Sequence, residues 1–120
     1  MPHYVDGFVL PVPKARLQEY RKLAELSGGI WKEHGALAYY EGEADDVKPG
    51  KVTSFPQAVD LKDDETVIFS FIVYPSRAER DRINEKVMAD PRLAFMSDPQ
   101  KMPFDGMRMF WGGFKSLVEY

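Results

Sequence analysis

The sequence predicts an α+β fold with the element order β-α-β-β-α-β and a four-stranded antiparallel sheet. Three observations support this prediction. Four segments are rich in large apolar residues with strand-like spacing. Two segments between them place apolar residues at helical spacing. The length of 120 residues suits a single domain, residues 1–120, that can bury a core of its own.

The first half of the chain predicts strand, helix and strand. Residues 4–12 (YVDGFVLPV) alternate apolar residues as a strand does, and residues 14–27 carry an apolar helical stripe. The pair Gly28-Gly29 is expected to end or break this helix, with residues 30–34 adding one more turn. Residues 36–44 (ALAYYEGEA) are expected to form the second strand.

Residues 45–64 do not fit a regular element well. They contain turn residues, an acidic stretch and Pro56, which would interrupt a short edge strand. Because long connections without structure are unusual in compact domains, we expect a structured excursion or a functional flap.

The second half of the chain predicts strand, helix and strand again. Residues 65–76 (ETVIFSFIVYPS) form a strand, and Ser76 followed by Glu79 fits the capping box of a helix. Pro91 limits that helix, whose apolar face is narrow. The expected members of this face are Ala78, Ile83, Val87 and Met88. Residues 107–120 are expected to form the last strand.

This order is the split βαβ arrangement of ferredoxin-like folds, with strand order 4-1-3-2 and both helices on one face. The third strand is then central, yet both of its faces are apolar. Its odd positions from Val67 to Val73 and its even positions from Ile68 to Tyr74 each supply several large residues. Leaving four such side chains wet would forgo an amount comparable to the ~5–15 kcal/mol stability of a domain. We therefore expect a homodimer that packs sheet against sheet, or a monomer whose residues 45–64 fold over the open face.

Composition narrows the possible partners and locations. The chain has no cysteine, which excludes disulfides and thiolate chemistry, and its formal net charge is −3 with a pI near 5.4. A nucleic-acid partner is not expected, because binding the phosphate backbone relies on a basic surface. No apolar run reaches the ~20 residues of a membrane helix, and no signal peptide is apparent. We expect a cytoplasmic protein without a membrane partner.

Two residues are candidates for acid–base chemistry. Asp6 lies on an otherwise apolar strand face, where burial would raise its pKa. The alternative is a hydrated or paired carboxylate near the strand end, with Lys115 as its expected partner. His34 could act as a base or metal ligand, or could simply be a helix-terminal histidine. Two strand spacings separate the backbones of Asp6 and His34 by about 10 Å, so a direct hydrogen bond between them is not expected.

Four further residues are candidates for ligand binding. Trp31, Tyr40 and Trp111 could line an aromatic pocket, or could be ordinary core or interface residues. Arg108 could hold an anionic substrate, or could form a surface ion pair with a nearby carboxylate.

Several motifs resemble those of one family across nearly the whole chain, in the same order. They are YVDGFVLPVPK, WKEHGALAYYE, GKVTSFPQAV, DETVIFSFIVYPSRAERDR, MADPRL and MPFDGMRMFWGGF. This pattern is similar to the domain of unknown function 1428 family, the YbaA-like proteins. The resemblance implies a dimeric α/β-barrel and no assigned activity. The Gly28-Gly29 pair departs from the family pattern before WKEHGAL.

Three functional hypotheses follow, in order of preference. The first is a homodimeric barrel that binds a small molecule in its cavity, including the case of an enzyme that needs no cofactor. The second is a non-catalytic dimeric module whose barrel is filled by its own side chains. The third is haem or metal binding, for which only His3 and His34 offer an axial ligand. No cofactor and no metal site are predicted.

Overall fold

The sheet has the strand order that the sequence predicts. The computed structural model describes residues 2–120. Its strands are β1 (Tyr4–Pro13), β2 (Ala38–Glu43), β3 (Glu65–Tyr74) and β4 (Phe110–Lys115). They lie in the order β2-β3-β1-β4, and every neighbouring pair is antiparallel. The long strands β1 and β3 are therefore central, as expected.

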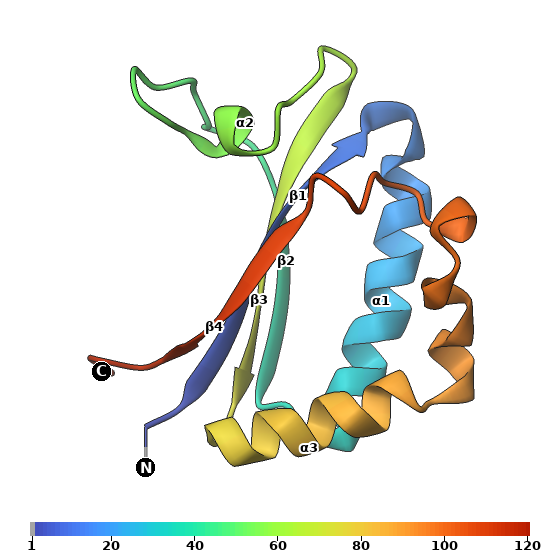
Figure 1. Ribbon diagram of the computed structural model, residues 1–120, viewed down its shortest axis with the longest axis vertical. Coiled ribbons are helices and arrows are strands. Elements are labelled where there is room, and N and C mark those ends of the chain that lie inside the picture. Colours follow the sequence, from blue (N-terminus) through green and yellow to red (C-terminus); the bar gives the residue numbers. More distant parts are fainter. Residues whose placement is uncertain (1) are drawn as a thin grey trace.

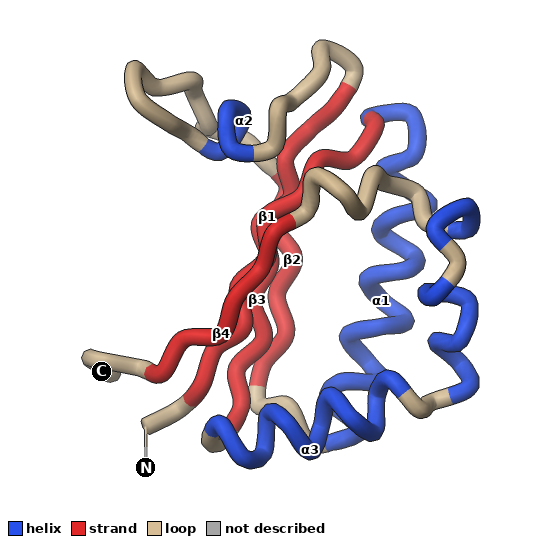
Figure 2. The backbone as a smooth tube through the Cα atoms, viewed as in Figure 1, coloured by secondary structure: helices blue, strands red, loops and turns tan. Residues whose placement is uncertain are grey.

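The two long helices lie on the same side of this sheet (Figure 1). They are α1 (Leu17–His34) and α3 (Arg77–Met88), and the short α2 (Phe55–Ala58) lies on the opposite side of the strands (Figure 2). Three 3₁₀ helices occupy the connections: η1 (Lys14–Arg16), η2 (Pro91–Ser97) and η3 (Pro99–Lys101). This arrangement is the α+β, ferredoxin-like fold that the element order predicts.

Strand register decides which apolar face the helices cover. Leu10 and Ile68 are paired neighbours that pack with Tyr20 of α1, so the even positions of β1 and β3 face the helices. The odd positions form an outer face. Its members are Val5, Val9, Val67, Phe69, Phe71, Val73, Tyr40, Phe110 and Phe114. The two-sided pattern of the central strand thus divides into one covered face and one open face.

The helix α1 does not end at Gly28-Gly29, so that prediction was wrong. It continues to His34 and ends at Gly35, whose φ of +121° favours glycine. A Cβ on Gly28 would lie 2.8 Å from the Tyr39 ring, so the helix passes close to β2 at this point. Packing of α1 on the sheet outweighs the ~1 kcal/mol that each interior glycine costs.

Residues 45–64 form a structured excursion without an edge strand. Ser54 caps α2 by accepting a hydrogen bond from the Gln57 backbone N–H. Val59 is buried against Val9 and Val67, at one end of the outer face. The excursion therefore covers only part of that face.

The other elements show two further differences from expectation. In α3, Ser76 is the N-cap and both Ile83 and Val87 are fully buried, but Ala78 and Met88 are exposed. The strand β4 is shorter than residues 107–120 at both ends, and its C-terminal end is set by β1, its sole neighbour. Lys115 already lies opposite Tyr4, the first residue of β1, so later residues have no strand to pair with.

Between residues 2 and 120, no helix combines the length and the apolar character needed to span a membrane.

Candidate functional site

A cavity of about 430 Å³ lies between the helix-facing side of the sheet and α1. The connection between α3 and β4 supplies part of its wall through Met96, Met102 and Phe104. Most of its lining is apolar. The polar side chains in the lining are Asp6, Tyr20, Ser27, Tyr39, Glu41, Ser70 and Asn84.

Glu41 is the most chemically distinctive residue of this cavity. Its carboxylate accepts hydrogen bonds from the hydroxyls of Tyr20 at 2.5 Å and Tyr39 at 2.6 Å. Burial raises the pKa of Glu41, although the two hydrogen bonds act in the opposite direction. Burial, followed by the negative charge of Glu41, raises the pKa of both tyrosines. The cluster joins α1 to β2 and places a carboxyl group suited to proton transfer at the cavity wall.

Ser70 lies beside Glu41 on the central strand β3. Strand pairing puts it directly opposite Glu41 on one side and Phe8 on the other. Ser70 is only 6% exposed, and its hydroxyl forms no hydrogen bond with any group of residues 2–120. Within those residues, no fully enclosed side-chain oxygen lacks a partner, so the Ser70 hydroxyl must open on the cavity that it lines.

Asp6 lines the same cavity and is paired, as the simpler interpretation predicted, but with a different partner. Both of its oxygens lie 3.1 Å from Nε of Arg80 on α3. Lys115 lies opposite Tyr4, and the residue opposite Asp6 is Gly113. The Arg80 guanidinium also lies 5.0 Å from the Tyr4 ring centroid. Asp6 is therefore held as one half of a buried ion pair.

The two tryptophans line the cavity, whereas Tyr40 does not. Nε1 of Trp31 lies 3.1 Å from the Tyr74 hydroxyl and 3.0 Å from Oδ1 of Asn84. Trp111 stacks on Phe8 with 6.0 Å between ring centroids. Tyr40 is 61% exposed on the outer face of the sheet, where it stacks on Phe71.

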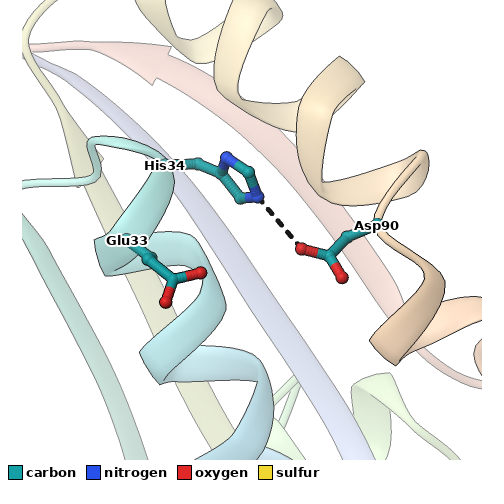
Figure 3. A group of neighbouring side chains, drawn as sticks. All are labelled: Glu33, His34 and Asp90. Atoms are coloured by element: carbon teal, nitrogen blue, oxygen red, sulfur yellow. Dashed lines mark hydrogen bonds and ion pairs between the residues drawn. The ribbon is translucent and has the colours of Figure 1, made fainter.

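His34 lies in a separate ion network at the end of α1 (Figure 3). Its Nε2 is 3.1 Å from Asp90, so it pairs with Asp90 and not with Asp6. His34, Glu33 and Asp90 bring three potential metal ligands within 4.8 Å of one another. However, Arg92 pairs with both carboxylates, and its hydrogen bonds hold the pKa of Asp90 well below its usual range. The guanidinium thus already supplies the positive charge that a metal ion would bring.

Arg108 is also committed to ion pairs outside the cavity. It contacts Glu65 at 2.7 and 2.5 Å and Asp105 at 2.9 Å, and it donates to the carbonyl oxygens of Val59 and Asp60. These contacts tie the start of β4 to β3 and to the 45–64 excursion. They match the ion-pair interpretation of this residue, except that the pair with Glu65 is largely buried and not at the surface.

The positions of His3 and His34 do not support binding of haem or a metal ion in the cavity through a histidine ligand. His34 belongs to the network with Asp90, and His3 pairs with Glu119 at 2.6 Å. Neither side chain belongs to the lining of the cavity.

Sequence reasoning missed Glu41 and Ser70. Each left a signal: Glu41 shares a strand face with Tyr39, and Ser70 is the single small polar residue between Ile68 and Ile72. Asp6, Trp31 and Trp111 were identified in advance and do lie at the cavity.

Comparisons with known proteins agree with the resemblance found in the sequence. The model of the family described as "Protein of unknown function (DUF1428)" matches residues 3–106. The chain is 47% identical over 116 residues to the uncharacterized protein YbaA of Escherichia coli K12, covering 97% of each chain, and equally similar to YbaA of Shigella flexneri.

Solved structures show the same fold at low sequence identity. A dimeric ferredoxin-like protein from an uncultured marine organism matches with a TM-score of 0.65 at 11% identity, over 100% of both chains. A nipsnap family protein with unknown function from Agrobacterium tumefaciens matches with a TM-score of 0.57 at 16% identity. That match covers 96% of this chain and 88% of the other.

Proposed function

The chain belongs to the DUF1428 family, and we propose that it is a homodimer in which each protomer binds a small molecule in the cavity between α1 and the sheet. The observation that carries the proposal is the cavity itself. Its volume of about 430 Å³ lies within the ~300–1,000 Å³ typical of small-molecule sites. Its largely apolar lining with a few converging polar groups is also typical of such sites.

The cavity favours this proposal over a purely structural module, although it lies on the helix side of the sheet and not in the barrel interior that the sequence suggested. A purely structural module would be stabilised by side chains that fill such a space, since voids forgo dispersion contacts. Here the side chains of Ser27 and Ser70 are small at positions where larger ones would close the space. An interior kept open next to a carboxyl group with a raised pKa suits a bound molecule, including one that exchanges a proton.

The outer face of the sheet supports the homodimer. Tyr40 is 61% exposed and Phe114 is 66% exposed, and both Phe69 and Phe110 are also exposed. The 45–64 excursion contacts Phe69 through Phe55, yet all four side chains stay substantially exposed. A second copy packed sheet against sheet would bury them on both protomers. Two solved structures with this fold are themselves described as dimeric ferredoxin-like proteins, at 11% and 10% identity.

Native mass spectrometry of protein purified from its own host tests both parts. We expect the mass of two chains plus a retained small molecule. The substitution Ala24→Phe, at a position of α1 that lines the cavity, should abolish retention, while Lys22→Phe on the exposed side of α1 should not.

A bare dimer that takes up no compound from a fragment library, even at millimolar concentrations, would contradict the ligand site. A single-chain mass at micromolar concentration would contradict the dimer.

A further inference from the structure

We infer that the cavity selects an uncharged or cationic molecule with a flat apolar body and one hydrogen-bond donor, such as an aromatic alcohol or amine, held between Ser70 and Glu41. The inference deepens the proposed ligand site and rests on it. Carboxylate and phosphate compounds should bind only weakly.

The lining of the cavity disfavours anions, and the cations Arg21 and Lys32 line the adjoining hollow between α1 and β2 instead. No lysine, arginine or histidine from residues 2–120 belongs to its lining, which contains two carboxylates, Asp6 and Glu41. Arg80 neutralises Asp6, but the contacts of Glu41 are two uncharged hydroxyls. A buried anion would therefore lose its hydration without gaining a positive partner.

The hydrogen-bonding groups around Glu41 favour a donor on the ligand. The hydroxyls of Tyr20 and Tyr39 both donate a hydrogen bond to Glu41. Their oxygen atoms can therefore only accept a hydrogen bond from a ligand. The Ser70 hydroxyl is free to accept and to donate. Since Ser70 and Glu41 are paired neighbours on adjacent strands, their Cβ atoms are about 5 Å apart. One hydroxyl or amino group can thus reach both residues.

The remaining walls suit a flat apolar body. Trp111 stacks on Phe8 on the sheet side, and Phe104 packs edge-on against Tyr20 at 5.7 Å between centroids. Met102 and Met109 add flexible apolar side chains that adapt to the outline of a ligand.

The test uses four compounds that share one ring system: naphthalene, 2-naphthol, 2-naphthylmethylamine and 2-naphthoate. Their affinities for the full chain are measured near neutral pH by quenching of tryptophan fluorescence and by calorimetry. We expect 2-naphthol and the amine to bind at least about tenfold more tightly than 2-naphthoate, because one unpaired buried charge is worth at least that factor.

Variants assign this preference to the two residues. Ser70→Ala should weaken 2-naphthol binding about three- to tenfold, the worth of one hydrogen bond, and leave naphthalene unchanged. Glu41→Gln should narrow the gap between the amine and 2-naphthoate. Glu43→Gln is the matched control, because Glu43 is an exposed residue on the same strand face, and it should change nothing.

The outcomes separate this inference from the proposed function. Tight 2-naphthoate binding, or unchanged preferences in Ser70→Ala and Glu41→Gln, would overturn the inference while the ligand site stands. Failure of all four compounds to bind would count against the ligand site itself.

Discussion

Nε of Arg80 lies 3.1 Å from both carboxylate oxygens of Asp6, across 74 positions of sequence. Asp6 is 1% exposed, and the side chain of Arg80 is 13% exposed. The pair connects the first strand to α3 beneath the Tyr4 ring. Glu41, by contrast, is the carboxylate of the cavity lining whose contacts are hydroxyl groups and not a guanidinium.

Removing one charge of this pair should destabilise the fold strongly. Asp6→Asn removes the buried counter-ion of Arg80, which keeps only its pair with the exposed Asp81, and we expect a loss of about 2 kcal/mol in the free energy of unfolding. Urea denaturation measures this loss. The control is Arg21→Ala, which breaks the exposed Arg21–Glu25 pair and should cost about 0.5 kcal/mol or less. Equal effects of the two substitutions would contradict the assigned role of the Asp6–Arg80 pair.

The stability of the protein should depend on pH through Glu41. Burial raises its folded pKa above the ordinary value of 4.5, so the folded state binds more protons than the unfolded chain above that pH. Its stabilising contribution is present below the unfolded pKa and is lost as pH rises through the folded pKa. Glu41→Gln should therefore gain stability relative to the wild type as the pH rises from the unfolded pKa of Glu41 through its higher folded pKa. A difference between the two proteins that stays flat with pH would show that Glu41 titrates normally.

Tyr20, Tyr39 and Tyr74 should resist ionisation. Burial raises the pKa of each above the usual value of about 10. Their contribution to the free energy of unfolding is fully present below about pH 10 and is lost above it, because the tyrosines ionise more easily in the unfolded chain. Absorbance of tyrosinate should rise in two stages, the second together with the loss of circular dichroism. A single early stage accounting for all six tyrosines would be inconsistent with the buried cluster.

The two adjacent glycines of α1 should respond oppositely to alanine. Nothing lies within 4 Å of a Cβ added to Gly29, so Gly29→Ala should stabilise the helix by about 0.5–1 kcal/mol. A Cβ on Gly28 would meet the Tyr39 ring at 2.8 Å, and such overpacking costs about 1–3 kcal/mol. Thermal denaturation of both variants gives the comparison. Stabilisation by Gly28→Ala would mean that α1 does not press on Tyr39.

The outer face can be tested by placing a charge on it. Phe69→Glu puts a carboxylate on the central strand of that face, and we expect the dimer to dissociate at concentrations at least about 100-fold higher than for the wild type. Met107→Glu, at an exposed position before β4, is the control. Sedimentation velocity over a concentration series measures both. A Phe69→Glu protein that dimerises as tightly as the control would place the interface elsewhere.

The spacing of apolar residues along the strands was enough to predict the two faces of the sheet and the order of its strands. Alternation in β1 and β3 set two apolar faces, and the order of elements set β3 between β1 and β2. These features follow from the two-residue period of a strand and from short-range helix signals, such as the Ser76 cap. The same alternation singled out Asp6 on an apolar face.

Tertiary structure alone decided the partners. Arg80 rather than Lys115 pairs with Asp6 because α3 crosses the sheet at that point, and no local pattern encodes where a helix crosses. Gly28 continues α1 because β2 lies against it, although glycine by itself favours a break. Burial in the folded protein raises the pKa of Glu41, and its hydrogen-bond partner Tyr20 comes from a different element, 21 positions away in sequence. The side chains that contact a buried carboxylate are set by the packing of elements that are distant in sequence. The same packing determines the shape of the cavity and the polar groups that line it.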